Sequence, residues 1–149
     1  MGRMRLFLDA NVLFLAGYSS DSPVHDLLAL ARAGRCELVA SVYAVEKASR
    51  NLVAKGPANA VGALEQALTL IALVHEAPQR FVDQISAPVL SDPTDVPIHM
   101  AAVYCSADIL VTGDRRAFGR HFRRRIMGTE VLLLRDALRR VLGLPLAGA

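Results

Sequence analysis

The feature that most constrains the fold is a series of short, continuously apolar runs that alternate with helix-like segments. Five runs read as strands: residues 5–9, 36–40, 72–75, 109–112 and 131–133. Five segments have the spacing or end signals of helices: residues 23–33, 41–53, 57–71, 115–121 and 136–142. Apolar strands that alternate with helices indicate a parallel sheet covered on both faces. We therefore predict a three-layer α/β/α fold with a central, mostly parallel sheet.

Local residues mark where some of these helices begin and what they pack against. Ser41 is expected to cap one helix, and Asp95 is placed to cap another that has Pro97 in its first turn. His99 follows Asp95 at the spacing of one helix face, and we interpret it mainly as a packing residue. Residues 78–89 carry no clear pattern, so no element is predicted there.

Length and composition indicate one domain over residues 1–149. The apolar runs are interrupted well before the roughly 20 residues that a membrane span requires. The basic, apolar start resembles a signal peptide, but Asp9 and Asn11 interrupt it, so we interpret it as a first strand. Cys36 and Cys105 form neither a disulfide framework nor a metal spacing. A cytoplasmic location and no membrane association are the expectations.

Four acidic residues are expected to converge at one edge of the sheet. Asp9 ends the first strand, Asp114 follows the strand at 109–112, Asp95 opens the helix before that strand, and Glu46 lies on the helix after the second strand. Ligands of such sheets bind beyond the carboxyl ends of the strands. Clustered carboxylates repel one another unless a cation lies between them, and oxygen ligands suit Mg²⁺ or Mn²⁺. The structural alternatives are a helix cap for Asp95, a turn for Asp114 and a solvated position for Glu46.

Three sequence blocks resemble the PIN-domain nucleases. These are LFLDANVLF with Asp9, SVYAVEKASRNL with Glu46, and DPTDVPIHMAAVYCSADILVTGD with Asp95 and Asp114, followed by RRAF. The blocks keep the order of the family and span nearly the whole chain. The likeness is greatest to the branch that includes the VapC-type toxins of toxin–antitoxin pairs.

The resemblance implies hydrolysis of RNA phosphodiester bonds with one or two Mg²⁺ or Mn²⁺ ions. It implies that Asp9, Glu46, Asp95 and Asp114 are metal ligands, directly or through water. It also implies that Asn11 and Thr112 orient acids or touch phosphate, while Asp92 joins the site or replaces Asp95. An antitoxin partner and a homodimer formed through the helices between residues 41 and 71 are further expectations from the resemblance.

Positive charge is concentrated after Asp114, although the formal net charge is only +3. We interpret six arginines there as nucleic-acid-binding residues that hold the phosphates beside the scissile one: Arg115, Arg116, Arg120, Arg123, Arg124 and Arg125. The alternative for each of them is a solvated helix face.

Two other functions fit parts of the sequence. Haloacid-dehalogenase-like phosphatases and receiver domains also begin with an acid at the end of a strand, but they need a lysine late in the chain. The only lysines here are Lys47 and Lys55. A catalytically silent module that binds RNA or protein remains open, although acids without metal would repel the phosphate that the arginines attract.

Overall fold

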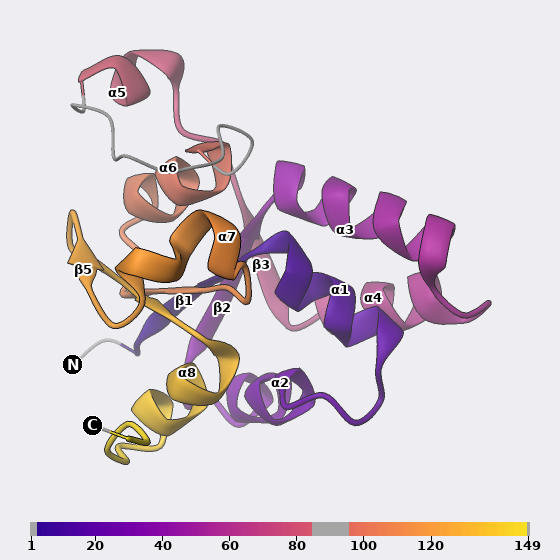
Figure 1. Ribbon diagram of the computed structural model, residues 1–149. Coiled ribbons are helices and arrows are strands. Elements are labelled where there is room, and N and C mark those ends of the chain that lie inside the picture. Colours follow the sequence, from indigo (N-terminus) through magenta and orange to yellow (C-terminus); the bar gives the residue numbers. More distant parts are fainter. Residues whose placement is uncertain (1–2, 85–95, 149) are drawn as a thin grey trace.

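A six-stranded sheet forms the centre of the molecule in the computed structural model, which describes residues 3–84 and 96–148. The strands lie in the order β3-β2-β1-β4-β6-β5 (Figure 1). Their bounds are β1 Arg5–Leu8, β2 Glu37–Ser41, β3 Ile71–Val74, β4 Ile109–Val111, β5 Arg125–Ile126 and β6 Thr129–Leu132. Every neighbouring pair is parallel except β5 and β6. The predicted, mostly parallel sheet is confirmed.

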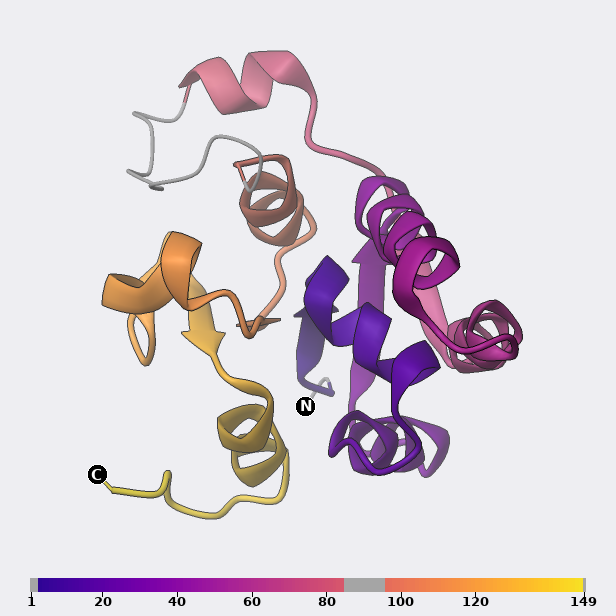
Figure 2. The same ribbon diagram turned by 45° about the vertical axis from the view of Figure 1, so that its right-hand side comes forward.

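Helices lie on both sides of the strands, which confirms the three-layer architecture. Their bounds are α1 Ala10–Tyr18, α2 Val24–Arg32, α3 Val42–Lys55, α4 Ala60–Leu68, α5 Gln79–Gln84, α6 Val96–Tyr104, α7 Arg115–Phe118 and α8 Leu134–Val141. Helices α1, α3 and α4 form one group, and α6 and α7 lie across the strands from it (Figures 1 and 2). No helix in the described ranges has the length and apolar run needed to cross a bilayer.

The predicted elements are present, with ends that differ by one to three residues, but helix α1 was not predicted. Its sequence, ANVLFLAGY, is apolar on nearly all sides and therefore lacks the polar stripe that marks a surface helix. In the structure, α1 is packed between α3 and α4, and five of its residues are buried. The two-residue strand β5 and helix α5 were also not predicted.

Close packing of α1 against α3 and α4 sets the position of α3 above the sheet. A Cβ atom added to Gly17 of α1 would lie 2.6 Å from the backbone oxygen of Ala60 and 2.6 Å from a methyl carbon of Leu52. Only glycine lets the helices approach this closely without a shift. Ser41 caps helix α3 as predicted, because its hydroxyl accepts a hydrogen bond from the Ala44 amide at 3.2 Å.

His99 of α6 is fully buried and packs beside Phe118, in agreement with its interpretation as mainly a packing residue. Its ring centroid lies 6.2 Å from that of Phe118, and neither ring nitrogen has a hydrogen-bond partner among the described residues. Burial, with a smaller contribution from the charge of His121, lowers the pKa of His99 from 6.5 to about 4. The imidazole is therefore uncharged at neutral pH.

Because the imidazole of His99 is buried and uncharged, we predict that the folded protein loses stability in mild acid. The pKa of His99 is lower in the folded than in the unfolded chain, so the unfolded chain takes up the proton first as the pH falls from 6.5 to about 4. The free energy of unfolding should drop across this window by up to about 3 kcal/mol relative to His99→Met. Urea unfolding of both proteins at several pH values measures the difference. His75→Gln, at an exposed histidine, is the control, and a slope unchanged in His99→Met would contradict the assignment.

Candidate active site

Asp9 lies at the junction of β1 and α1, with only 2% of its surface exposed. Its Oδ1 accepts a hydrogen bond from the Ala10 amide at 2.6 Å, and its Oδ2 accepts one from the Thr112 hydroxyl at 2.6 Å. The Asp9 amide donates to the Val111 carbonyl of the neighbouring strand β4 at 3.0 Å. A carboxylate that was predicted to end a strand therefore also caps the following helix.

The loop after β4 is tied to the start of α1 by the side chain of Asn11. Asn11 donates to Asp9 Oδ2 at 3.4 Å and accepts from the Gly113 amide at 3.0 Å. The Asp114 amide donates to the Thr112 hydroxyl oxygen at 3.0 Å, and Asp114 Oδ1 accepts from the Arg116 amide at 3.1 Å. Asp9 and Asp114, which are far apart in sequence, thus share one hydrogen-bonded network.

Several groups around the Asp9 carboxyl shift its pKa in opposite directions. Burial is the largest and raises its pKa above the usual 3.8. The hydrogen bonds from Thr112 and Ala10 and the positive charge of Lys47 oppose this shift, whereas the negative charge of Asp114 adds to it. A further cation at this position would favour the ionised carboxylate.

A pocket of about 260 Å³ opens beside these acids, and we call it the Asp9 pocket. Its walls come from the junction of β1 and α1, from α1 and α3, and from the loop after β4. The residues that line it are Asp9, Ala10, Asn11, Phe14, Lys47, Asn51, Lys55 and Asp114. The structure thus brings together Asp9, Asn11 and Asp114, three of the residues singled out in the sequence, with Thr112 bonded to Asp9 behind them.

Helix α3 turns lysine rather than glutamate toward the pocket. Glu46 is exposed and does not line the Asp9 pocket, whereas Lys47 does. Neighbouring positions on a helix differ in direction by about 100°, so one residue decides which side chain faces the site. Asp92 and Asp95 lie outside the described residues. Within the described ranges, no group of three or more acidic, histidine or cysteine residues could hold a metal ion.

Lys47, Asn51 and Lys55 were not recognised from the sequence as site residues. Their spacing of four residues, which places them on one face of a helix, was the available signal. Glu76 was also missed. Its carboxylate accepts a hydrogen bond from the Tyr43 amide at 2.7 Å and so supports the first turn of α3.

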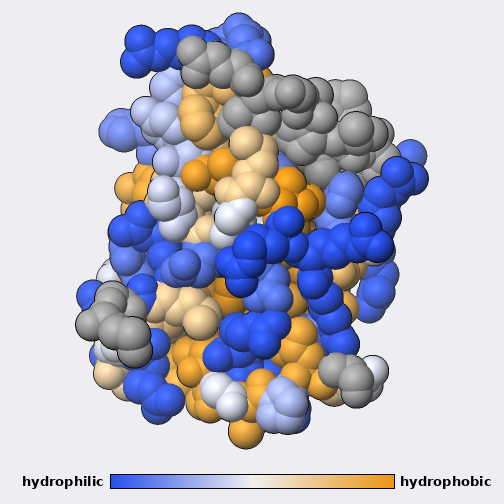
Figure 3. All heavy atoms as spheres, turned by 90° about the vertical axis from the view of Figure 1, so that its left-hand side faces the viewer, coloured by the Kyte–Doolittle hydropathy of each residue, from blue (hydrophilic) through white to orange (hydrophobic). Residues whose placement is uncertain are grey.

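Hydrophilic side chains crowd the face of the molecule on which β5 lies (Figure 3). The six arginines after Asp114 are all exposed, but their surroundings differ. The guanidinium of Arg115 lies 6.0 Å from the centroid of the Phe122 ring. Arg125 donates to the Gly128 carbonyl at 3.2 Å and lines a different pocket, together with Asp108, Glu130 and Arg140.

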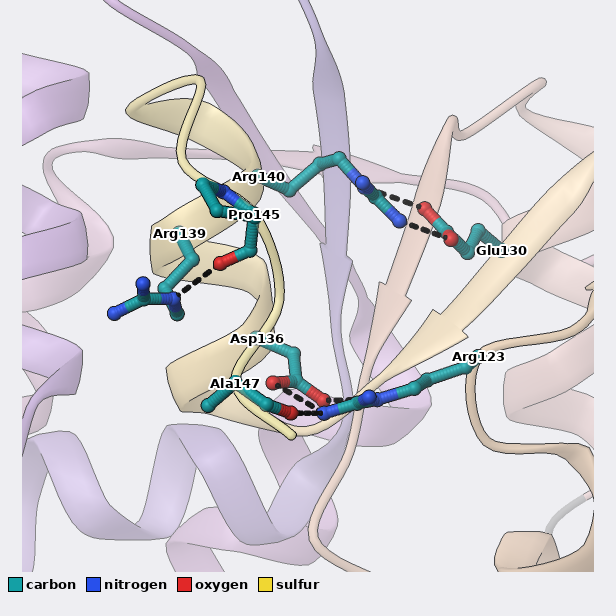
Figure 4. A network of polar contacts seen from close by, with 7 residues as sticks. All are labelled: Arg123, Glu130, Asp136, Arg139, Arg140, Pro145 and Ala147. Carbon is teal, nitrogen blue, oxygen red and sulfur yellow. Dashed lines mark hydrogen bonds and ion pairs between the residues drawn. The ribbon is translucent and has the colours of Figure 1, made fainter. Parts of the chain in front are cut away.

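Arg123 joins the chain segment after α7 to the C-terminal helix. Its Nε lies 3.1 Å from the Asp136 carboxylate, and its Nη2 donates to the Ala147 carbonyl at 2.6 Å (Figure 4). Arg140 makes a second link across the same region, to Glu130 of β6 at 2.6 Å. These two arginines stabilise the position of α8, and Arg123 is therefore engaged away from the Asp9 pocket.

The buried carboxylate predicts that the metal-free protein gains stability when the charge of Asp9 is removed. The folded pKa is raised, so the penalty for the ionised form grows as the pH rises from 3.8 through the folded pKa. Asp9→Asn keeps the acceptor for the Ala10 amide and should raise the melting temperature at pH 7 by about 2–4 °C, the shift that 1 kcal/mol produces at this size. Thermal melts in EDTA measure it, and a lower melting temperature would contradict the expectation.

Comparison with known proteins identifies the family. A family model described as PIN domain matches residues 5–116. A solved structure of VapBC2 from Rickettsia felis, bound to a DNA fragment from their promoter, contains a chain 15% identical in sequence with a TM-score of 0.61, and the match covers 87% of this chain and 98% of that one.

A second similar structure is VapBC-1 from nontypeable Haemophilus influenzae. Its sequence identity is 15% and its TM-score 0.55, and the match covers 89% of this chain and 99% of that chain. No curated protein sequence matches the chain. Since the family model spans most of the sequence and the folds agree, the chain belongs to the PIN domain family.

Proposed function

We propose that the protein is a metal-dependent ribonuclease that hydrolyses RNA phosphodiester bonds at the Asp9 pocket. The observation that carries this proposal is the meeting of Asp9 and Asp114 in one pocket at the carboxyl ends of β1 and β4. Membership of the PIN domain family supports a nuclease. The nearby arginines support an anionic polymer as the substrate.

The oxygen donors of the pocket fit a hard divalent cation such as Mg²⁺ or Mn²⁺. A carboxylate has about four lone-pair sites, and three on Asp9 are used by Ala10, Thr112 and Asn11. This leaves a site on Oδ1 for a cation, with the Asp114 carboxylate as a second donor. Asp95, directly before α6 in sequence, is proposed as the third donor, with Asp92 as the alternative. Glu46 is not included because it is exposed outside the pocket.

The protein's own residues hold the site in place. Thr112 and Asn11 fix the orientation of Asp9 through their hydrogen bonds, and the hydroxyl of Thr112 also accepts from the Asp114 amide. A bound Mg²⁺ or Mn²⁺ ion would activate water and screen charge on the phosphoryl oxygens. Arg115 and Arg116, directly after Asp114, are proposed to hold neighbouring phosphates, with Arg120 and Arg124 farther along the RNA.

The proposed function also suggests which proteins this chain binds. Both similar structures are described as VapBC, and the chain resembles VapC-type toxins in its motifs. We therefore propose that it acts as the toxin of a toxin–antitoxin pair in the cytoplasm and binds an antitoxin protein. A homodimer through α3 and α4 belongs to the same proposal.

Metal dependence and the role of Asp9 are tested with one cleavage assay. The wild-type protein should cleave RNA with Mg²⁺ or Mn²⁺ and lose this activity in EDTA. Asp9→Asn should lower the turnover rate by at least about a hundredfold, because it removes the charge that holds the cation. Glu46→Gln is the matched control on α3 and should stay within about threefold of wild type. Full cleavage by Asp9→Asn, or in EDTA, would overturn the Asp9 pocket as a metal-dependent active site, whereas RNA binding without cleavage at any metal concentration would favour the silent binding module.

Arginines that bind RNA can be distinguished from arginines that stabilise the fold by measuring RNA binding and thermal stability of their variants. Replacing Arg115 and Arg116 together by Ala should weaken RNA binding and reduce the slope of log affinity against log salt by about 1–2. Arg123→Ala should leave this slope unchanged and lower the melting temperature, because Arg123 is tied to Asp136 and Ala147. Fluorescence anisotropy at several salt concentrations and thermal melts measure the two effects. An unchanged slope in the double variant would mean that this pair is only a solvated face.

A further inference from the structure

Helix α3 presents a basic face to the acidic side of the Asp9 pocket. Lys47, Asn51 and Lys55 occur at intervals of four residues, so their side chains lie along one face of the helix, and all three line the pocket. They line the same cavity as Asp9, Asn11 and Asp114. Both lysines of the chain are therefore placed on this face, although the other basic residues are arginines.

Lys47 lies nearer to the N-terminal end of α3 than Lys55 does, and its charge acts on Asp9. It is half-buried, and its positive charge favours the ionised form of Asp9. A cation fixed at this position has two consequences for the ligands of the pocket. It repels a divalent cation that approaches Asp9, and it attracts a phosphate group that enters the same space.

We propose that Lys47 is the phosphate-contacting residue of the Asp9 pocket and that its ammonium group holds a non-bridging phosphate oxygen of the bound nucleic acid. The proposal rests on the function proposed above and deepens it. Before the nucleic acid binds, Lys47 offsets part of the acidic charge. When a phosphate engages Lys47, its negative charge reduces the repulsion between the lysine and a divalent cation.

Metal and nucleic acid should therefore bind with positive coupling, since each strengthens the site for the other. Asn51 and Lys55 extend this face away from Asp9 by one and two helical turns, which is about 6 and 12 Å. Asn51 provides a neutral hydrogen-bonding group and Lys55 a second positive charge along the path of the nucleic acid. In this arrangement Lys47 contacts the phosphate next to the acids, while Asn51 and Lys55 contact the phosphates that follow it.

Substitutions of Lys47 test the proposal because they should change metal and nucleic-acid affinity in opposite directions. Lys47→Gln should tighten Mn²⁺ binding to the free protein about three- to tenfold, and Lys47→Glu should tighten it further, as measured by isothermal titration calorimetry. Both should weaken the binding of a fluorescein-labelled single-stranded RNA in EDTA by at least about threefold. A purely structural role would not produce opposite shifts.

Two controls complete the experiment. Lys55→Gln removes the same charge two turns farther along α3 and should change Mn²⁺ affinity less than twofold, while Lys47→Arg keeps the charge and should retain RNA binding. In cleavage assays, Lys47→Gln should raise KM for RNA more than it lowers kcat. Thermal melts of each variant verify that the fold is intact.

The outcomes separate this inference from the proposed function. If Lys47→Gln binds Mn²⁺ and RNA with wild-type affinity while the wild type cleaves RNA only with metal, the role of Lys47 is overturned and the nuclease stands. If the wild type cleaves RNA in EDTA or shows no response to metal, the proposed function fails. The role of Lys47 is then tested by RNA binding alone, and an RNA affinity of Lys47→Gln equal to that of the wild type overturns this role as well.

Discussion

The candidate site depends on the parallel pairing of β1 with β4. Leu8 is paired with Val111, and the Asp9 amide donates to the Val111 carbonyl one residue beyond the last strand position of β1. This register places the Thr112 hydroxyl next to the Asp9 carboxylate. A shift of one residue would turn Thr112 to the other face of the sheet and leave a buried carboxylate without its partner, which is costly.

A carboxylate at this position is held by a balance between burial and local polar partners. Burial raises the pKa of Asp9, and hydrogen bonds from Thr112 and Ala10 together with the charge of Lys47 act in the opposite direction. The carboxylate of Asp9 therefore shares its pocket with the positive charge of Lys47. The close approach of α1 to α3 at Gly17 fixes the position of α3, and with it Lys47, relative to Asp9, and this position is the basis of the role proposed for Lys47.

The arginines of the C-terminal third fall into two groups with different surroundings. Arg123 and Arg140 bind Asp136 and Glu130 and fasten α8 to the sheet. Arg115 and Arg116 directly follow the acid at the end of β4 and are exposed. A basic cluster identified from the sequence alone combines both groups, because a count of charges does not show that Arg123 and Arg140 are bonded to the carboxylates of Asp136 and Glu130.

The sequence by itself determined most of the order of strands and helices, without α1, α5 and β5, and the two acids of the pocket. Apolar runs, helix spacing and the Ser41 cap are local signals, and a carboxylate at the end of an apolar strand is visible without any contact information. Tertiary structure decided the rest. Helix α1 has no polar stripe, so only its packing between α3 and α4 shows what it does. Whether Glu46 or Lys47 faces the Asp9 pocket depended on the rotation of α3 about its axis, because side chains of neighbouring helical residues differ in direction by about 100°.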